Sequence, residues 1–421
     1  MKRWLLLAGV CASLLLWGCS SVDTAPLSKI NINYTPSVPD WENESYPPET
    51  MADKTAFQYF EDEGLTAGWN LGNTLDAFVN GKGSETGWGN PAINQDLMNG
   101  VKAAGYTIIR IPVTWMGHIG PAPDHTIAQA RLERVAAVAE MAHNAGLKVI
   151  INLHHDGSTA SLEKEDGWLS VRKAYQSKDE YAKITHKYIR VWAQIARYFK
   201  NYGDWLMFES MNEIHDGGWG WSEAFKANPN AQLKIVNEWN QYFTDVVRNT
   251  GGNNAQRYVV LTAYNTNFQQ TLASTFILPN DSASSRQVVS FHYYDPYEFG
   301  IAGKRSNWGS TADKNKVAND FAPFKQKFIN NNIPVIIGEA GAVRQLYPDD
   351  KAKENTAYQN RLDYLSWVFG KAKENKLVPL YWDNGLFTGN GEKFGLFDRK
   401  TGQANSAESM ACIQAMINAI K

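Results

Sequence analysis

The sequence contains little cysteine. Its 421 residues include only three, at positions 11, 19 and 412, and the first two lie in or just after an apolar N-terminal run. Three cysteines placed in this way cannot build the disulfide framework that stabilises many small secreted domains. Cys412 lies in an apolar C-terminal run, residues 410–420, and is predicted to be a small buried hydrophobic residue.

The chain also lacks a strong charge of either sign and the common phosphate-binding motifs. Its formal net charge is -2, so no basic field attracts nucleic acid, and a nucleic-acid partner is not expected. Neither GxGxxG nor GxxxxGK[ST] occurs, and HExxH is absent. The nearest approach to GxSxG is residues 220–224, GWSEA, which lacks the final glycine and does not favour a serine esterase. No cofactor and no metal are expected.

One apolar run is long, and it lies at the N-terminus. Lys2 and Arg3 precede residues 5–16, which are almost wholly apolar but too few to span a membrane comfortably. The run ends in Leu16-Trp17-Gly18-Cys19, which resembles the bacterial lipobox. The resemblance implies a signal peptide over residues 1–18, lipidation of Cys19 and a location in the bacterial cell envelope or outside the cell. Ordinary signal cleavage with an incidental cysteine is the alternative, and the membrane and face involved stay open.

Residues 19–51 are rich in Ser, Thr, Pro, Asn and acidic residues and show no periodicity. We expect a flexible tether there, between the lipid and the folded domain. No second change of composition follows, so residues 52–421 are predicted to form one catalytic domain. A monomer is expected.

Short apolar runs alternate with helical patterns through this domain. The pattern predicts eight strands, at residues 68–71, 107–111, 148–153, 205–208, 258–262, 288–291, 334–337 and 378–381. Stripes such as Leu132, Val135, Val138 and Ala142 have helical spacing. The alternation favours a parallel sheet with helical crossovers, and eight runs favour an α/β fold of the (β/α)8 TIM barrel type. A doubly wound open sheet is the alternative.

Polar residues follow several of these runs. Arg110, Asn152, Glu213, His292 and Glu339 lie at or just after the ends of five different strands. In a barrel the carboxyl ends of all strands meet at one face, where active sites form. Adjacent His154 and His155 would point to opposite sides if the strand continued through them.

Two of these residues have the chemistry of a glycosidase. Hydrolysis of a glycoside needs one protonated and one ionised carboxyl group on opposite sides of the anomeric carbon. Glu213 and Glu339 are the candidates, although a single Glu at a strand end more often only pairs with an Arg. Arg110 and Tyr294 are expected to hold Glu339 ionised, so that its pKa stays low and the pKa of Glu213 rises. Asn212 can bind a sugar hydroxyl.

The segments around these residues resemble glycoside hydrolase family 5, the cellulase family of retaining (β/α)8 enzymes. They are residues 68–76 (GWNLGNTLD), 110–115 (RIPVTW), 152–156 (NLHHD), 208–213 (FESMNE), 292–294 (HYY), 337–339 (IGE) and 381–382 (YW). The resemblance implies Glu213 as acid/base and Glu339 as nucleophile. It also implies a set of substrate-binding residues: Arg110, His154, Asn212, His292, Tyr294 and Trp382, together with Asn73, Asp76 and His155.

The implied activity is that of an endo-β-1,4-glucanase acting on a β-glucan. Residues 68–77, followed by Glu85 to Pro91, are similar to a branch that includes xyloglucan-active members. Residues 214–221, IHDGGWGW, depart from that branch, which usually has Pro directly after the Glu of the Asn-Glu pair. Xyloglucan, mixed-linkage glucan and β-mannan therefore remain alternative substrates. A metal hydrolase using the histidines, and a barrel that binds glycans without cutting them, are alternatives of other classes. The 15 Trp, 19 Tyr and 18 Phe suit both a large core and sugar binding.

Overall fold

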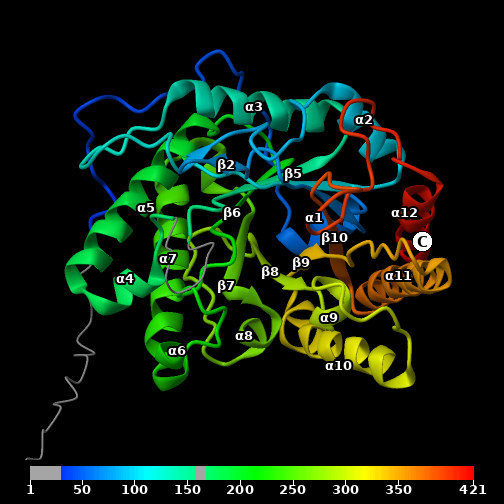
Figure 1. Cartoon of the computed structure of the whole chain (residues 1–421). Coiled ribbons are helices and arrows are strands. Elements are labelled where there is room, and N and C mark those ends of the chain that lie inside the picture. Colours follow the sequence, from blue (N-terminus) through cyan, green and yellow to red (C-terminus); the bar gives the residue numbers. More distant parts are fainter. Residues whose placement is uncertain (1–29, 158–166) are drawn as a thin grey trace, which may run out of the picture.

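Eight parallel strands form a closed barrel in the computed structural model, which describes residues 30–157 and 167–421 (Figure 1). The barrel strands are β1 (Gly68–Leu71), β4 (Ile108–Ile111), β5 (Lys148–Asn152), β6 (Leu206–Glu209), β7 (Val259–Asn267), β8 (Gln287–Tyr293), β9 (Val335–Ala340) and β10 (Leu377–Asp383). Each predicted run contributes one strand, and β1 closes the ring by pairing with both β4 and β10. The (β/α)8 barrel is therefore confirmed, and the open-sheet alternative is wrong. Two short strands, β2 (Phe78–Val79) and β3 (Lys82–Gly83), make a hairpin outside the barrel.

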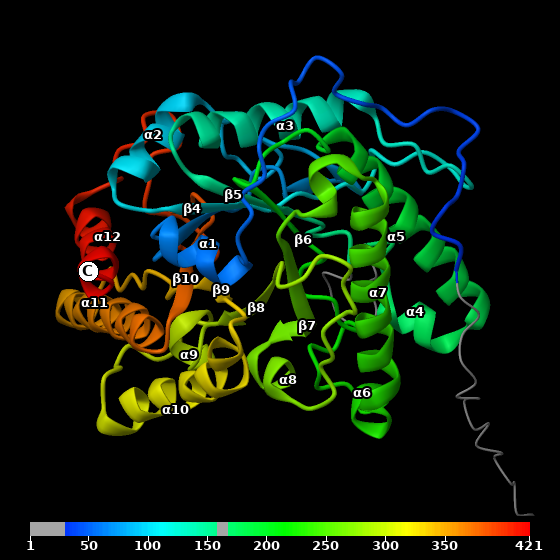
Figure 2. The same cartoon turned by 180° about the vertical axis from the view of Figure 1, so that it is seen from behind.

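Helices surround the barrel, and the longer ones lie around its outside (Figures 1 and 2). They are α1 (Ala56–Asp62), α2 (Gln95–Ala103), α3 (Gln129–Asn144), α4 (Val171–Gln176), α5 (Lys178–Tyr198), α6 (Glu223–Ala227), α7 (Pro229–Asn249), α8 (Phe268–Leu272), α9 (Tyr297–Gly300), α10 (Thr311–Lys327), α11 (Lys351–Glu374) and α12 (Ala407–Ala419). Two 3-10 turns lie at Gly252–Ala255 and Ile329–Asn331. Local sequence fixes many helix starts: Ser177 and Ser310, for example, accept N–H bonds from the first turns of α5 and α10.

The core has two layers because alternate strand residues face opposite sides of the barrel wall. Ile108, Ile150 and Ile336 belong to a cluster of buried residues inside the barrel, and Tyr59 and Phe60 of α1 pack onto it. The neighbouring residues Ile109, Ile151 and Ile337 belong to the larger cluster between the strands and the outer helices. Apolar side chains thus fill one end of the barrel and leave the polar residues at the other.

Residues 30–51 lie against the barrel, and this differs from the flexible tether predicted for residues 19–51. They contain no helix or strand, but their polar groups bind the domain. Asp40 pairs with Arg190 of α5 at 2.7 Å, and Glu49 accepts from Trp205 Nε1 at 2.6 Å. The Trp41 indole donates to Ile127 O at 3.0 Å. Composition suggested a tether, but a few charged and aromatic residues in this segment have specific partners on α5 and on the loops before α3 and β6.

The predicted signal peptide and Cys19 lie outside the described residues. Within the described ranges, no helix is both long and apolar enough to cross a membrane. Cys412 is buried in α12 and is not in a disulfide, as predicted.

Candidate active site

Glu213 and Glu339 meet at the carboxyl end of the barrel. Glu339 lies in β9, and Glu213 follows β6 by four residues. One carboxylate oxygen of Glu213, one of Glu339 and a ring nitrogen of His292 all lie within 4.8 Å of one another. The carboxyl groups of retaining glycosidases are about 5–5.5 Å apart, whereas inverting enzymes leave roughly 6.5–9.5 Å for a water molecule. The short separation fits the retaining geometry.

Both oxygens of Glu339 accept strong hydrogen bonds. Arg110 Nη1 donates to Oε1 at 2.8 Å, and Tyr294 OH donates to Oε2 at 2.9 Å. The carboxyl group is only 7% exposed and the guanidinium is fully buried, so water does not weaken the ion pair. The predicted contacts of Arg110 and Tyr294 with Glu339 are confirmed.

Arg110 is the centre of a larger buried network. Its Nε donates to Glu209 Oε2 at 2.7 Å, Nη2 to Asn212 Oδ1 at 2.8 Å and Nη1 to Asn70 Oδ1 at 3.1 Å. Asn152 Nδ2 also donates to Glu209, at 2.9 Å. Asn70 and Glu209 were not among the predicted site residues, although both are polar residues in otherwise apolar strands.

Glu213 has fewer partners than Glu339. Its Oε1 pairs with His292 Nδ1 at 2.8 Å, while the same ring nitrogen is 3.6 Å from Glu339 Oε2. The Glu213 side chain is 25% exposed, and no Lys or Arg among the described residues lies as close to it as the Arg110 guanidinium lies to Glu339. Glu339 is thus hydrogen-bonded on both oxygens, whereas the Glu213 side chain is partly exposed.

The pKa order of the pair in the free site is opposite to the predicted one. Burial raises the pKa of Glu339 above its usual value, despite the lowering effect of His292 and Arg110. Burial also raises the pKa of Glu213, but the hydrogen bond from His292 and the charges of His292, His215 and His155 together outweigh it and bring that pKa below its usual value. The prediction was wrong because the sequence did not show that His292 pairs with Glu213.

Three further predicted residues lie close together beside the pair. His154 is buried between amide groups, with its Nδ1 3.3 Å from Asn152 Nδ2 and its Nε2 3.4 Å from Asn212 Nδ2. The Trp382 ring lies parallel to the His154 ring, with 5.8 Å between centroids and 6° between planes. Gly72 allows this position, because a Cβ there would lie 2.9 Å from the indole and 2.8 Å from Asp383 O.

Asn73, Asp76 and His155 form a second group next to the first. His155 Nε2 is 3.7 Å from Asp76 Oδ2, and Asp76 accepts from the backbone N–H groups of Asn73 and Thr74. The ring of His155 packs against the exposed Trp88, with 5.4 Å between the ring centroids. Strand β5 ends at Asn152, so the alternation of side chains along a strand does not apply to His154 and His155. Their rings pack against each other, with 4.4 Å between centroids. The structure therefore brings all the predicted site residues of the described chain to one end of the barrel.

Comparison with known proteins identifies the family. The profile of the cellulase family (glycosyl hydrolase family 5) matches residues 72–387. Endoglucanase A of Paenibacillus barcinonensis is 38% identical over 373 residues, which are 83% of this chain and 87% of that protein. The chain belongs to glycosyl hydrolase family 5. A xyloglucan-specific endo-β-1,4-glucanase of Bacteroides ovatus is 36% identical over 420 residues, 94% of this chain and 78% of that one. Among solved structures, a broad-specificity endoglucanase from Bacteroides salanitronis has a TM-score of 0.79 at 38% identity, covering 90% of this chain and 99% of that one.

Membership of glycosyl hydrolase family 5 confirms the predicted resemblance and makes the chain a glycoside hydrolase. Two groups of side chains have the donors of a metal site: Asp76 with His154 and His155, and Glu213 with His292 and Glu339. In both groups carboxylate oxygens already accept protein hydrogen bonds. A metal ion would have to compete with these contacts.

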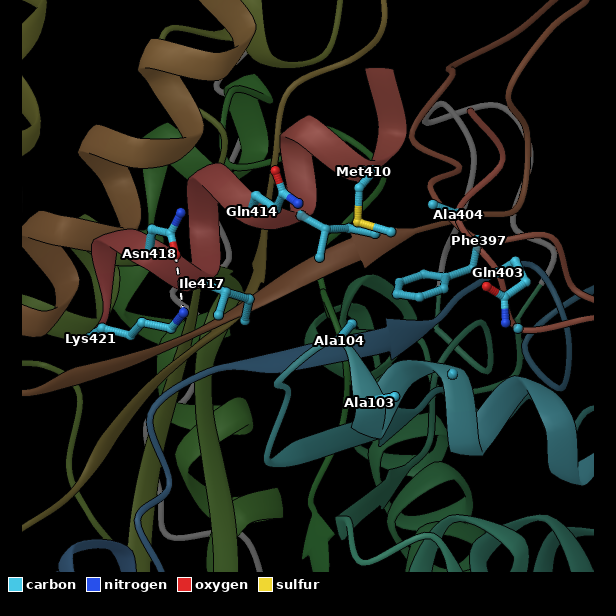
Figure 3. A pocket seen from close by; sticks show the side chains of 13 residues that line it. Ala103, Ala104, Phe397, Gln403, Ala404, Met410, Gln414, Ile417, Asn418 and Lys421 are labelled. Carbon is cyan, nitrogen blue, oxygen red and sulfur yellow. Dashed lines mark hydrogen bonds between the residues drawn. The ribbon is translucent and has the colours of Figure 1, made fainter. Parts of the chain in front are cut away.

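The family 5 barrel also has a cavity away from the site. Its volume is about 320 Å³, and it lies between α2, α12 and the segment 397–404 (Figure 3). Met410, Ile417 and Phe397 are among its lining residues. None of the predicted site residues lines it.

Proposed function

We propose that the chain is an endo-β-1,4-glucanase that cleaves internal bonds of a β-glucan with retention of configuration. Glu213 is the acid/base and Glu339 is the nucleophile. The observation that carries the proposal is the short separation of the two carboxyl groups, with Arg110 and Tyr294 both donating to Glu339. The endoglucanase names of the relatives support the same reaction.

In the first step, one oxygen of Glu339 attacks the anomeric carbon while Glu213 gives its proton to the glycosidic oxygen. The carbon–oxygen bond breaks, the aglycone leaves as an alcohol, and a glycosyl ester remains on Glu339. In the second step, Glu213 takes a proton from water as the water oxygen attacks the same carbon. Glu339 leaves as a carboxylate, and two inversions restore the starting configuration.

The reaction requires the proton on Glu213, whereas the free site favours it on Glu339. The hydrogen bonds that Arg110 and Tyr294 donate to the two Glu339 oxygens favour the ionised form of this group, with and without substrate. Among the described residues, Glu213 is hydrogen-bonded to His292, and its side chain is 25% exposed. A glycosidic oxygen that enters beside Glu213 competes with His292 for this carboxyl group. Substrate binding therefore moves the proton to Glu213, and the two groups titrate as one coupled pair.

Replacement of Glu213 tests the acid/base role. Glu213→Gln keeps the shape of the side chain but has no proton to donate, so kcat on cellohexaose falls by about 10²- to 10⁴-fold. The matched control is Glu223→Gln, the same substitution at an exposed side chain, which leaves kcat unchanged. If Glu213→Gln stays within about tenfold of the unchanged enzyme, the acid/base assignment is wrong.

The substrate within the β-1,4-linked class is decided by the loops around the cleft. One relative is named as xyloglucan-specific and another as having broad specificity. Residues 214–221 differ from the pattern of that branch and border Glu213. We expect the highest kcat/KM on an unsubstituted β-glucan, measured on carboxymethylcellulose, barley glucan, xyloglucan and β-mannan with sizing of the products. If no reducing ends are released from any of the four polysaccharides, the chain is a barrel that binds glycans without cutting them. If activity is lost on chelation and recovers on added Zn²⁺, the chain is a metal hydrolase.

The chain is also proposed to be held on a bacterial membrane by lipid on Cys19. The support is the lipobox-like sequence Leu16-Trp17-Gly18-Cys19. Cys19→Ser removes the thiol that would carry lipid, so the protein moves from the membrane fraction to the soluble fraction. Detergent partitioning with Cys412→Ser as the control measures this, and unchanged partitioning of Cys19→Ser contradicts the anchor.

A further inference from the structure

A layer of polar side chains follows the apolar layer inside the barrel. Strands β4, β5 and β6 each contribute one residue to the buried interior cluster: Ile108, Ile150 and Met207. Two positions further along, the same face of each strand carries a polar residue: Arg110, Asn152 and Glu209. Glu209 Oε2 accepts from Arg110 Nε at 2.7 Å and from Asn152 Nδ2 at 2.9 Å. Glu209 therefore points into the barrel, next to Arg110.

Glu209 is a buried carboxylate that is only half satisfied. Its side chain and that of Arg110 are fully buried, and its second oxygen, Oε1, has no hydrogen-bond partner among the described residues. Burial of a carboxylate is unfavourable unless hydrogen bonds replace its water, and an apolar side chain of similar size often serves the fold as well. The charge at this position therefore indicates a role in the site rather than in stability.

Arg110 divides its charge between two carboxylates. Its Nε is 2.7 Å from Glu209 Oε2, and its Nη1 is 2.8 Å from Glu339 Oε1. The negative charge of Glu209 offsets part of the guanidinium charge and so opposes the ionisation of Glu339. This agrees with the pKa of Glu339, which burial raises above its usual value although Arg110 is in contact with it.

Glu209 also fixes the direction of the guanidinium. The group is planar, so a hydrogen bond at Nε helps to set where the two Nη atoms point. Nη1 donates to Glu339, and Nη2 donates to Asn212, the residue before the proposed acid/base. One contact at Nε thus orients donors toward both halves of the site.

Other charged or titratable groups face Glu339 or Arg110 from the remaining elements, and none of them shares the guanidinium as Glu209 does within the described chain. They are His154 after β5, Glu213 after β6, His292 in β8, Tyr294 after β8 and Glu392 after β10. Their charges act on the site in the same way when Glu209 is replaced, so a change at Glu209 can be read separately.

We propose that Glu209 is a positioning residue, which orients the Arg110 guanidinium toward Glu339 and offsets part of its charge, and which thereby sets the acid limit of activity. The inference rests on the proposed function, because activity needs an ionised Glu339 only if this residue is the nucleophile. Glu209 acts through Arg110 and touches no reacting atom.

The test uses 2,4-dinitrophenyl β-cellobioside, whose leaving group departs without a proton. The acid limb of its kcat/KM therefore follows the ionisation of Glu339 rather than the protonation of Glu213. Glu209→Gln keeps an oxygen that accepts from Arg110 Nε but removes the charge. The acid limb moves to lower pH, and kcat/KM on the plateau falls by less than about tenfold, the size of one weakened hydrogen bond.

Glu209→Asp separates position from charge. It keeps the carboxylate but withdraws it from Arg110 by one methylene group, so the guanidinium is misplaced. The plateau kcat/KM falls about 10- to 10²-fold, and the acid limb moves less than in Glu209→Gln.

Asp281→Asn is the matched control. Asp281 forms a buried ion pair with Arg248 of α7 at 2.7 Å, and both side chains are 6% exposed. Its replacement lowers the Tm but leaves the pH profile in place, so lost stability alone does not imitate the expected shift.

The proposal is overturned if the acid limb of Glu209→Gln stays in place or moves to higher pH, or if Asp281→Asn moves it equally. If Glu209→Gln does not fold, Glu209→Asp decides, and an unchanged plateau in that variant overturns the proposal. If the unchanged enzyme does not turn over the cellobioside, or if Glu339→Gln is as active as the unchanged enzyme, the proposed function itself fails.

Discussion

At the scale of single residues, Arg110 holds four polar partners at once. Glu209, Glu339, Asn70 and Asn212 all accept from its guanidinium. The group is fully buried, so its charge is balanced by protein rather than by water. Taking ions out of water costs several kcal/mol each, and only a full set of hydrogen bonds offsets that cost. The same side chain thus stabilises the barrel and orients Glu339, the proposed nucleophile.

Replacement of Arg110 tests both effects. Arg110→Gln leaves two buried carboxyl groups without their cation, so the free energy of unfolding falls by about 3–5 kcal/mol. Arg110 lowers the pKa of Glu339, so its loss raises that pKa further. The nucleophile must be ionised, and the acid limb of kcat/KM therefore moves to higher pH. Urea unfolding and a pH–rate profile measure the two results.

Arg197 supplies the control for Arg110. Its side chain is 43% exposed and its nearest carboxylate oxygen is 3.4 Å away, so Arg197→Gln changes stability by less than about 0.5 kcal/mol and leaves the pH profile in place. An acid limb that moves to lower pH in Arg110→Gln contradicts the electrostatic account.

At the scale of elements, the ends of the strands decide the site. Periodicity predicted the eight strands to within a few residues, because each is an apolar run bounded by turns or helices. The meeting of Arg110, Glu213 and Glu339 followed from that topology. The partner of His292 could not be predicted, since it depends on side-chain directions after the strand ends. The two histidines after β5 show the same limit: the strand stops at Asn152, and the alternation rule stops with it.

Residues 30–51 mark a second limit. Their composition is that of a linker, but composition is an average over the segment and does not show which single residues have partners in the fold. A few contacts, such as Asp40 with Arg190, hold this segment against the outer helices. Such contacts depend on where distant residues lie in the folded barrel, which local sequence does not contain.

Substitution of Gly72 tests the packing at the end of β1. Gly72→Ala places a methyl group 2.8 Å from Asp383 O and 2.9 Å from the Trp382 indole, so it displaces Trp382. We expect about 1–3 kcal/mol of lost stability and a raised KM for cellohexaose. Thermal unfolding and steady-state kinetics measure these effects.

Gly370→Ala is the matched control in α11. Its new methyl group lies 3.9 Å from the nearest atoms outside its helix, in ordinary contact. Alanine is the better helix former, so this variant is more stable by about 0.5–1 kcal/mol. Equal effects of the two substitutions would show that close contact with Trp382 is not what Gly72 provides.

At the scale of the whole molecule, the barrel separates stability from chemistry. Apolar layers and α1 fill one end, and the buried polar network lies at the other. Two exposed indoles lie on loops near this network, Trp88 beside His155 and Trp219 beside His215.

The central claim is that Glu339 forms a covalent bond with the sugar. A 2-deoxy-2-fluoro-β-cellobioside with a dinitrophenolate leaving group forms the ester quickly and releases it slowly, so the ester accumulates. Mass spectrometry of the intact protein and of its peptides then measures where the sugar is attached. The account predicts one added fluorocellobiosyl group on the peptide that contains Glu339. Attachment at another residue, or turnover with inversion and no adduct, would contradict it.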